Sequence, residues 1–499
     1  MSTIGNSMAR GAAWMVLMRL VIRGAGLINM VILARLLVPE DFGLIAMAMI
    51  FVGAIEILSE FNFDVVLIKE QQVRRAHYDT AWTLSIIRGV VMAALLLAIA
   101  GPAASVFDEP RLSPMISALS VSSLLLGLQN IGVVDFRKSL DFRKDFIFMA
   151  SERVVAVMVS VGLALWLQNY WALVGGIIAG KLWRVVASYA MHPFRPTFAL
   201  TMWRELFAFA KWLLLQNMLL FFRNRIDRLV IGKVLGAATL GLYTIAFDLA
   251  NLVTSELMAP VRRALFPGYA KLAHQPDRIS RLFVDIFGLT LWLGAPIAVG
   301  TALLADPLIH VLLGAEWRGA VPIVQMLAVA GFIALLSSGS HPVFLALGRP
   351  ELQTYLAALS VVLLIPGLIV GTARAGVIGA AIAVVVAQLV VAVLDIVLVL
   401  RLLKLRSAAV GKAAWRALAA LALMTAGVHA LKQLWPDHQS VLADAALLGG
   451  AGLVGGSLYV GTTWLLWHLF ADGQGPERHL VKPIRYRIDN LLSKVRAGA

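Results

Sequence analysis

The stretch that decides the fold is Leu33-Ala34-Arg35-Leu36-Leu37-Val38-Pro39-Glu40-Asp41-Phe42-Gly43-Leu44-Ile45-Ala46-Met47-Ala48, because it returns later in the same chain. Residues 12–48 align without a gap with residues 210–246, at a constant offset of 198. Arg35 is matched by Lys233, and the residues that recur identically include Ala12, Trp14, Leu37, Gly43, Leu44 and Ala48. Duplicated helical bundles with a binding site between the halves are a common design of secondary transporters.

The composition is that of a membrane protein. The chain of 499 residues is 60% hydrophobic and 14% charged, with a mean hydropathy of +0.85. A soluble domain carries roughly 25% charged residues, and a bilayer is crossed by about 20 apolar residues of helix. No cysteine is present, so disulfides are excluded, and no cleavable signal peptide is recognisable at the start.

The apolar runs predict an all-α polytopic protein with about 14 transmembrane helices. The expected spans are 11–36, 41–62, 81–104, 113–134, 146–168, 170–190, 207–232, 238–260, 282–305, 320–346, 352–373, 376–402, 413–433 and 441–470.

The connecting loops predict the orientation. With the N-terminus inside, one side holds 27 Lys and Arg residues in its loops and tail, and the other holds six. Positive charge gathers on the cytoplasmic side, so we expect both termini there, in a bacterial inner membrane. The net charge of +15 has the same explanation, and we expect no nucleic-acid partner.

Six spans separate the two repeat copies, so both copies run in the same direction. The predicted lobes are therefore related by an axis along the membrane normal. We expect an N-lobe at 1–200, a C-lobe at 201–405, a C-terminal helix pair at 406–472 and a basic cytoplasmic tail at 473–499.

The repeat motifs resemble a known family. The 33–43 stretch is similar to the first-loop signature of the polysaccharide-transporter branch, the Wzx-type flippases, of the MOP flippase superfamily. Further similar stretches are 135–144 (Asp-Phe-Arg-Lys-Ser-Leu-Asp-Phe-Arg-Lys), 192–196 (His-Pro-Phe-Arg-Pro) and 224–246. The resemblance covers about residues 5–405. It implies a MATE/MOP-like fold and a flippase for undecaprenyl-diphosphate-linked oligosaccharides that works by alternating access.

Charged residues inside the spans are the candidate site, because a charge in the bilayer costs about 2.5–3.5 kcal/mol or more. Arginine binds phosphate oxygens in a bidentate manner, which suits a diphosphate. The candidates for a cationic substrate cavity are Arg19, Arg23, Arg88, Arg153, Lys211, Arg223 and Arg225.

Acidic residues inside the spans are candidates for proton or sodium coupling. They are Glu56, Glu60, Asp64, Asp248 and Glu256, and Asp285 and Asp395 also lie deep. Alternatively, the first three neutralise Arg19 and Arg23, and Asp248 pairs with an arginine of the seventh span.

Three local features leave alternatives open. Glu152 and Arg153 are adjacent and cannot face each other, so at least one needs a partner on another helix, unless both snorkel. Gly176-x-x-x-Gly180 predicts close helix packing. The 135–146 segment is either an amphipathic stretch on anionic headgroups or a surface that attracts the substrate.

The expected function has two competitors. A MATE-like multidrug or cation antiporter would display carboxylates in its cavity. A membrane-embedded polysaccharide polymerase or glycosyltransferase would need a long outer loop or an exposed acidic motif. We expect a transporter, without cofactor or metal, whose partners are the lipid-linked oligosaccharide, the bilayer and polysaccharide polymerase or assembly proteins.

Overall fold

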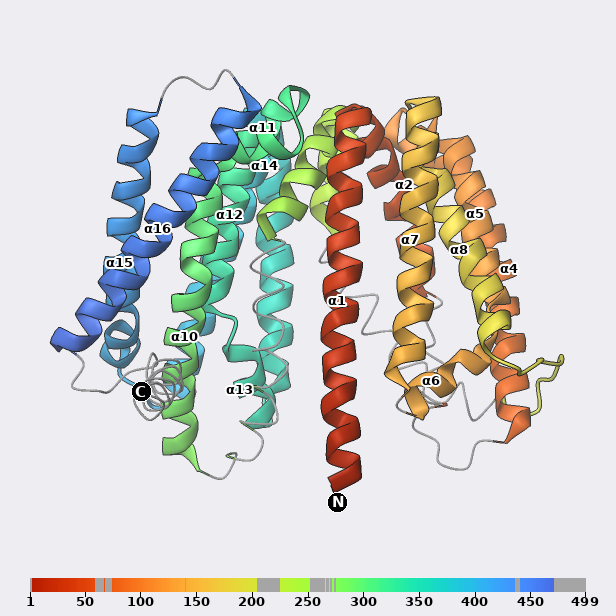
Figure 1. Cartoon of the computed structure of the whole chain (residues 1–499), viewed down its shortest axis with the longest axis horizontal. Coiled ribbons are helices and arrows are strands. Elements are labelled where there is room, and N and C mark those ends of the chain that lie inside the picture. The colour runs from red at the N-terminus through yellow and green to blue at the C-terminus, as the bar shows by residue number, and fades with distance from the viewer. Residues whose placement is uncertain are drawn as a thin grey trace, which may run out of the picture. The chain divides into compact units, whose positions relative to one another are not determined.

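The computed structural model describes residues 2–58, 67, 74–139, 141–203, 225–251, 265, 269, 272, 275–435 and 440–470. The chain forms two compact units, Met1–Thr244 and Ile245–Ala499. The described part is helical throughout, with connecting loops and turns (Figure 1). The predicted all-α membrane fold is therefore confirmed.

The helices of the first unit follow the predicted apolar runs. They are α1 (Ser2–Leu36), α2 (Pro39–Leu58), α4 (Arg75–Phe107), α5 (Leu112–Leu128), η1 (Ile131–Val133), α6 (Val134–Lys138), α7 (Phe142–Leu167), α8 (Trp171–Met191) and the start of a helical stretch Arg225–Asn251.

The second unit continues in the same way. Its helices are α10 (Pro276–Leu303), α11 (Ala305–Leu312), η2 (Ala315–Ala320), α12 (Val321–Leu336), α13 (Ser340–Ala346), α14 (Pro350–Leu402), α15 (Ser407–Leu434) and α16 (Val441–Phe470).

Ten helices of the described part are long and apolar enough to cross a membrane, or eleven if the bent pair α5 and η1–α6 counts as one. Two breaks explain why some predicted spans are merged. Inside α14 the backbone is non-helical at Ala375 and Gly376, where φ of Gly376 is 57°. Inside Arg225–Asn251, Gly236 has φ 80°. Gly236 lies in the predicted loop 233–237, and Ala375 and Gly376 lie at the boundary between the predicted spans 352–373 and 376–402. Glycine adopts positive φ at little cost.

The two repeat copies meet at equivalent glycines within the first unit. A methyl group on Gly43 would lie 1.7 Å from the carbonyl oxygen of Ala237, and one on Gly241 would lie 1.8 Å from that of Pro39. Pro39 and Ala237 are themselves related by the offset of 198. The contact is thus reciprocal, as expected for a two-fold axis that passes between the copies.

The predicted close packing at Gly176 and Gly180 is confirmed. A methyl group on Gly176 would lie 2.5 Å from the Cβ of Ser160, and one on Gly180 would lie 3.0 Å from the Cβ of Ala156. Both contacts join α8 to α7. The two helices therefore approach each other with little room for larger side chains.

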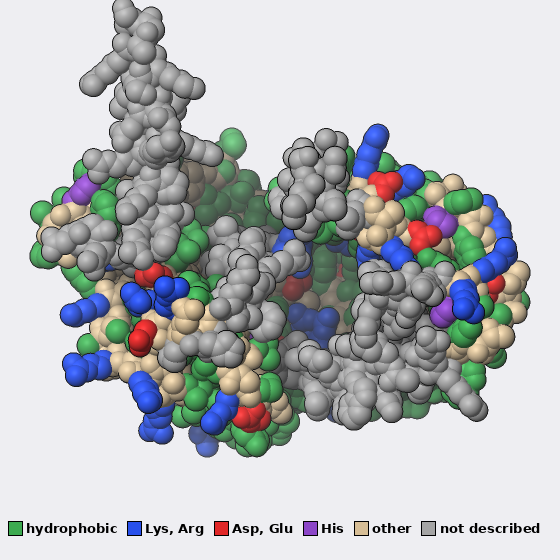
Figure 2. Space-filling view, turned by 90° about the horizontal axis from the view of Figure 1, so that it is seen from below, with side chains coloured by type: hydrophobic (Ala, Val, Ile, Leu, Met, Phe, Trp, Pro, Cys, Tyr) green, Lys and Arg blue, Asp and Glu red, His purple; other side chains and the backbone are tan. Residues whose placement is uncertain are grey.

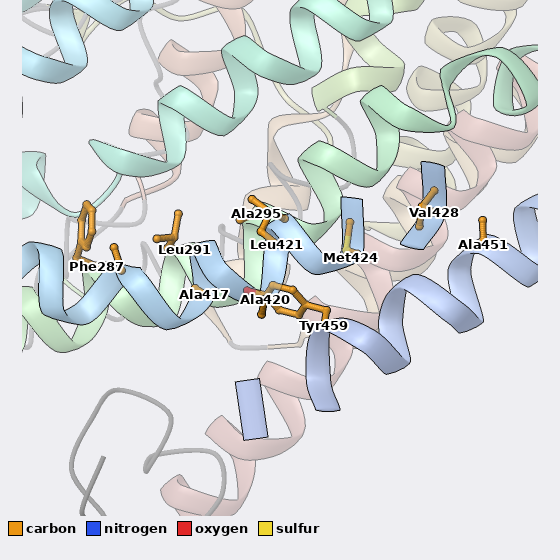
Figure 3. Close-up of a cluster of buried hydrophobic side chains, with 11 residues drawn as sticks. Phe287, Leu291, Ala295, Ala417, Ala420, Leu421, Met424, Val428, Ala451 and Tyr459 are labelled. Carbon is orange, nitrogen blue, oxygen red and sulfur yellow. The ribbon is translucent and has the colours of Figure 1, made fainter. Parts of the chain in front are cut away.

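The C-terminal pair α15–α16 packs on α10 in the second unit (Figure 3). The shared core contains Phe287, Leu291 and Ala295 of α10, Leu421 and Met424 of α15, and Ala451 and Tyr459 of α16. Polar contacts fix the same arrangement at both ends. The Tyr459 hydroxyl donates to the carbonyl oxygen of Trp292 at 3.0 Å, and Nδ1 of His310 on α11 lies 2.6 Å from the carboxylate of Asp444 on α16.

The segment 192–203 after α8 is bound along the first turns of α4. The backbone N–H of Thr197 donates to the carboxylate of Asp79 at 2.8 Å, and that of Ala199 donates to the hydroxyl of Thr83 at 3.0 Å. Ring contacts of Phe194 with Tyr78 and of Phe198 with Trp82 accompany these bonds. The segment is therefore held to the first unit over most of its length.

Candidate functional site

Two arginines lie together between α1 and α7 in the first unit. The guanidinium of Arg153 on α7 reaches the backbone of α1 at Gly26, where a methyl group would lie only 2.8 Å from its terminal nitrogen. The charge of Arg23, one turn earlier on α1, is close enough to act on Arg153. Both residues lie in helices long and apolar enough to span the membrane. The structure thus brings together two of the predicted basic residues.

Glu152, the neighbour of Arg153, is directed to α8 instead. Its two carboxylate oxygens lie 2.9 Å from Nζ of Lys181 and 2.7 Å from the guanidinium of Arg184. The prediction that one member of the Glu152–Arg153 pair has a partner on another helix is confirmed, so snorkelling does not describe Glu152.

Sequence reasoning missed Lys181 and Arg184. They are three residues apart in the span 170–190, which was used only for its glycine pattern. Two basic residues at this spacing share a helix face and lie deep in the bilayer, so the signal was available. Gln129, which accepts a hydrogen bond from Arg184 at 2.7 Å, carries no such signal.

The remaining predicted residues lie on other elements or outside the description. Arg19 is half-buried on α1, one turn before Arg23, and Arg88 is half-buried on α4, which packs against α2 and α5. Arg225 is half-buried at the start of Arg225–Asn251, Glu56 is half-buried on α2 and Asp248 is exposed. Lys211, Arg223, Glu60, Asp64 and Glu256 lie outside the described residues.

The second repeat copy holds a buried polar pair. The Tyr243 hydroxyl donates to the carboxylate of Asp227 at 2.8 Å, and both residues are buried. At the repeat offset Asp227 corresponds to Asn29 of α1, which accepts a hydrogen bond from Ser160 at 2.9 Å. Arg228 is also buried.

The aromatic side chains in and beside the 135–146 segment differ in burial. Phe136 on α6 is 4% exposed and Phe148, just beyond the segment, is 3% exposed, so these two belong to the protein core, whereas Phe142 and Phe146 are half-buried. The chain bends by 67° between α5 and η1–α6, which turns this stretch onto α7 and α8. Arg143 and Lys144 remain exposed.

His192 closes this end of the unit. Its Nε2 lies 3.4 Å from the carboxylate of Asp135, which also accepts a hydrogen bond from the Tyr78 hydroxyl. Burial lowers the pKa of His192 from its ordinary value, and the positive charges of Lys144 and Arg195 act in the same direction, against Asp135. His192 is therefore held in its neutral form below the pH at which a free histidine becomes charged.

Further buried or paired charged groups lie on other elements of the two units. Asp395 on α14 of the second unit is 4% exposed, and its Oδ2 has no hydrogen-bond partner among the described residues. On the first unit, Arg111 contacts Glu40 and Glu109 in and near the loop between α4 and α5, and its hydrogen bonds lower the pKa of Glu109. No group of three His, Cys, Asp or Glu residues in the described part could hold a metal ion.

The face seen from below shows where basic side chains gather. Lys and Arg side chains occupy its rim (Figure 2). In the first unit, Lys181 and Arg184 of α8 bind Glu152 of α7, and Arg153 follows Glu152 directly, so three cations accompany this one carboxylate. Such an arrangement favours an anionic ligand with several oxygen acceptors.

Known proteins of polysaccharide biosynthesis are similar to this chain. Residues 32–322 match the model of a family described as polysaccharide biosynthesis protein. The lipopolysaccharide biosynthesis protein WzxC of Escherichia coli K12 is 22% identical over 77% of this chain and 79% of its own length. The succinoglycan biosynthesis transport protein ExoT of Rhizobium meliloti is 26% identical over 69% of this chain and 70% of its own.

Solved structures share the fold. The lipid II flippase MurJ in an inward closed conformation superposes with a TM-score of 0.70 at 13% identity, over 91% of this chain and 99% of MurJ. An inward-facing MATE family multidrug transporter of the MOP superfamily gives 0.58 at 12% identity, over 76% and 94%. The chain is an integral membrane protein that shares the fold of these two solved structures, and it belongs to the family described as polysaccharide biosynthesis protein.

Proposed function

We propose that this protein translocates undecaprenyl-diphosphate-linked oligosaccharide repeat units across the inner membrane for O-antigen, exopolysaccharide or capsule assembly. The names of the relatives support polysaccharide assembly, since WzxC serves lipopolysaccharide biosynthesis and ExoT serves succinoglycan transport. Both termini lie in the cytoplasm in this proposal, as the loop charges predict.

The observation that carries the proposal is the excess of positive charge inside the spans of the first unit. Arg153 lies against α1 at Gly26, and the adjacent acid Glu152 is already bound by two cations of α8. A cluster with this net charge stabilises a diphosphate, which carries about two negative charges and several acceptor oxygens. A drug cation would meet repulsion at the same place.

Alternating access between the predicted lobes 1–200 and 201–405 would expose the site to each side of the membrane in turn. Arg19, Arg88, Lys211, Arg223 and Arg225 are proposed to extend the cationic cavity. Glu56, Glu60, Asp64, Asp248 and Glu256 are proposed as candidates for coupling to protons or sodium ions. The handover of the flipped unit to polymerase and assembly proteins is part of the same proposal.

The proposal is tested in proteoliposomes with a fluorescent undecaprenyl-diphosphate sugar. Arg153→Gln should slow translocation at least tenfold, because one interaction with a charged phosphate is worth about 1.5–3 kcal/mol. Arg401→Gln, which removes an exposed arginine at the end of α14, serves as control and should transport like the wild type.

Two results would contradict the proposal. One is translocation by Arg153→Gln at the wild-type rate. The other is export of cationic drugs by the wild type without any movement of the labelled lipid, which would favour the multidrug antiporter.

A further inference from the structure

Glu152, Lys181, Arg184 and Gln129 form a polar network between α7, α8 and the end of α5, here called the Glu152 network. Lys181 lies ten residues from either end of α8, which is about 15 Å along the helix axis. The network therefore lies near the middle of a membrane-spanning helix. Its exposed side-chain fractions are 16% for Glu152, 28% for Lys181 and 21% for Arg184.

Arg184 is fixed from several sides. Its guanidinium binds the Glu152 carboxylate at 2.7 Å, its Nε donates to Gln129 at 2.7 Å, and it lies over the Phe148 ring at 5.3 Å. Gly180, which directly precedes Lys181, brings the two backbones together, since a methyl group there would lie 3.5 Å from the carbonyl oxygen of Glu152. The Glu152 carboxylate is consequently held at the α8 side of α7.

This arrangement matters because Arg153 follows Glu152 directly. Successive residues of a helix point about 100° apart, so Glu152 faces α8 while Arg153 faces α1 at Gly26. The charge of Glu152 nevertheless acts on Arg153. In a site with low dielectric, an uncompensated carboxylate several ångströms away would weaken the attraction of Arg153 for an anion.

We propose that Lys181 and Arg184 are positioning residues: by binding and compensating Glu152, they leave the positive charge of Arg153 available for the phosphates of the substrate. The inference rests on the proposed function and deepens it, because it separates the cations of the first unit into two kinds. Arg153 contacts the anion, whereas Lys181 and Arg184 act on the anion only through Glu152.

The test is a charge-rescue series with the full-length protein in detergent micelles. The probe is a short-chain polyprenyl diphosphate with a fluorescent label, and binding is measured by fluorescence anisotropy. The variants are Lys181→Gln/Arg184→Gln, the same pair combined with Glu152→Gln, Glu152→Gln alone, and Arg153→Gln. Thermal unfolding is recorded for each of them.

The double variant should bind the probe on the order of tenfold or more weakly, because Glu152 is left uncompensated. Adding Glu152→Gln should restore binding to near the wild-type affinity. Glu152→Gln alone should bind more tightly than the wild type, and this variant leaves no buried unpaired carboxylate that could prevent folding. The pair Lys181→Arg/Arg184→Lys keeps both charges and should also bind.

The outcomes separate the two proposals. If the wild type does not bind the probe, or if Arg153→Gln binds it as well as the wild type, both the proposed diphosphate site and the positioning role are refuted. If those two behave as expected but the triple variant stays as weak as the double variant, only the positioning role is overturned. Weaker binding by Glu152→Gln alone would overturn it as well.

Discussion

The contact between the repeat copies makes a quantitative prediction about Gly43. The Cβ of an alanine there would lie 1.7 Å from the carbonyl oxygen of Ala237, and real Cβ atoms do not come closer than 3.0 Å to such an atom. The two backbones must therefore separate by about 1.3 Å or more. Neither is the flexible end of a side chain, so the helix starts themselves must move.

The expected cost of Gly43→Ala is about 1–3 kcal/mol, the usual range for overpacking of a tight contact. Alanine recovers about 1 kcal/mol through its higher helix propensity, so the net loss is about 0–2 kcal/mol. Gly241→Ala should lower the stability by the same amount, because the contact of its added Cβ with the Pro39 carbonyl oxygen, at 1.8 Å, is equivalent to the contact between Gly43 and Ala237. The measurement is thermal unfolding in detergent, followed by tryptophan fluorescence and circular dichroism.

Matched controls are available in the same unit. Gly101 on α4 and Gly162 on α7 have no atom within 4 Å of an added Cβ, so alanine should be neutral or stabilising there. Gly43→Ala and Gly241→Ala open the same contact, so the double variant should lose less stability than the sum of the two single losses. A Gly43→Ala midpoint at or above that of Gly162→Ala, or strict additivity of the two glycine variants, would refute the reasoning.

Three further predictions concern the ends of the two units. His192 has a lowered pKa in the folded protein, so the unfolded chain binds more protons just below pH 6.5. The contribution of His192 to the free energy of unfolding should therefore be complete above that pH and should decrease as the pH falls. In thermal unfolding at several pH values, His192→Asn should flatten this part of the curve of midpoint against pH. His310→Ala removes a 2.6 Å contact to a carboxylate that is 1% exposed, so it should cost about 1–3 kcal/mol and hasten proteolysis of α15–α16, while His429→Ala at an exposed position should do neither. Asp395→Asn should leave the unfolding midpoint unchanged or raise it, because Oδ2 of Asp395 is buried without a hydrogen-bond partner in the described part; a loss above about 1 kcal/mol would contradict this.

The sequence was sufficient for features that depend on local composition. Apolar length predicted the helices, and two glycines four residues apart predicted the close packing of α7 on α8. Both depend on residues that act within one helix or on one face of it. The same local reasoning found Arg153 as a candidate, because an arginine inside an apolar span is costly wherever the helix points.

Features that depend on helix rotation or on a bend could not be obtained in this way. The partners of Glu152 lie 29 and 32 positions away on another helix, and only the packing of α7 on α8 selects them. The burial of Phe136 follows the 67° bend before α6, which has no clear sequence signal. The burial of Arg228 depends likewise on how its helix packs, and the sequence of that helix does not reveal it.

The repeat and the charges support different conclusions about the site. The backbone contact is symmetric, since Pro39, Gly43, Ala237 and Gly241 exchange equivalent interactions at the offset of 198. The polar residues are not: Asn29 corresponds to Asp227, and Arg23 corresponds to Phe221. A duplicated scaffold needs matching residues only where the copies touch each other, and elsewhere each copy is free to change. A ligand whose charged and neutral parts differ needs such asymmetry, because a symmetric cavity would place the same charge on both sides. In the proposed function, the unmatched arginines of the first copy are thus the part of the repeat that would distinguish one end of a lipid-linked sugar from the other.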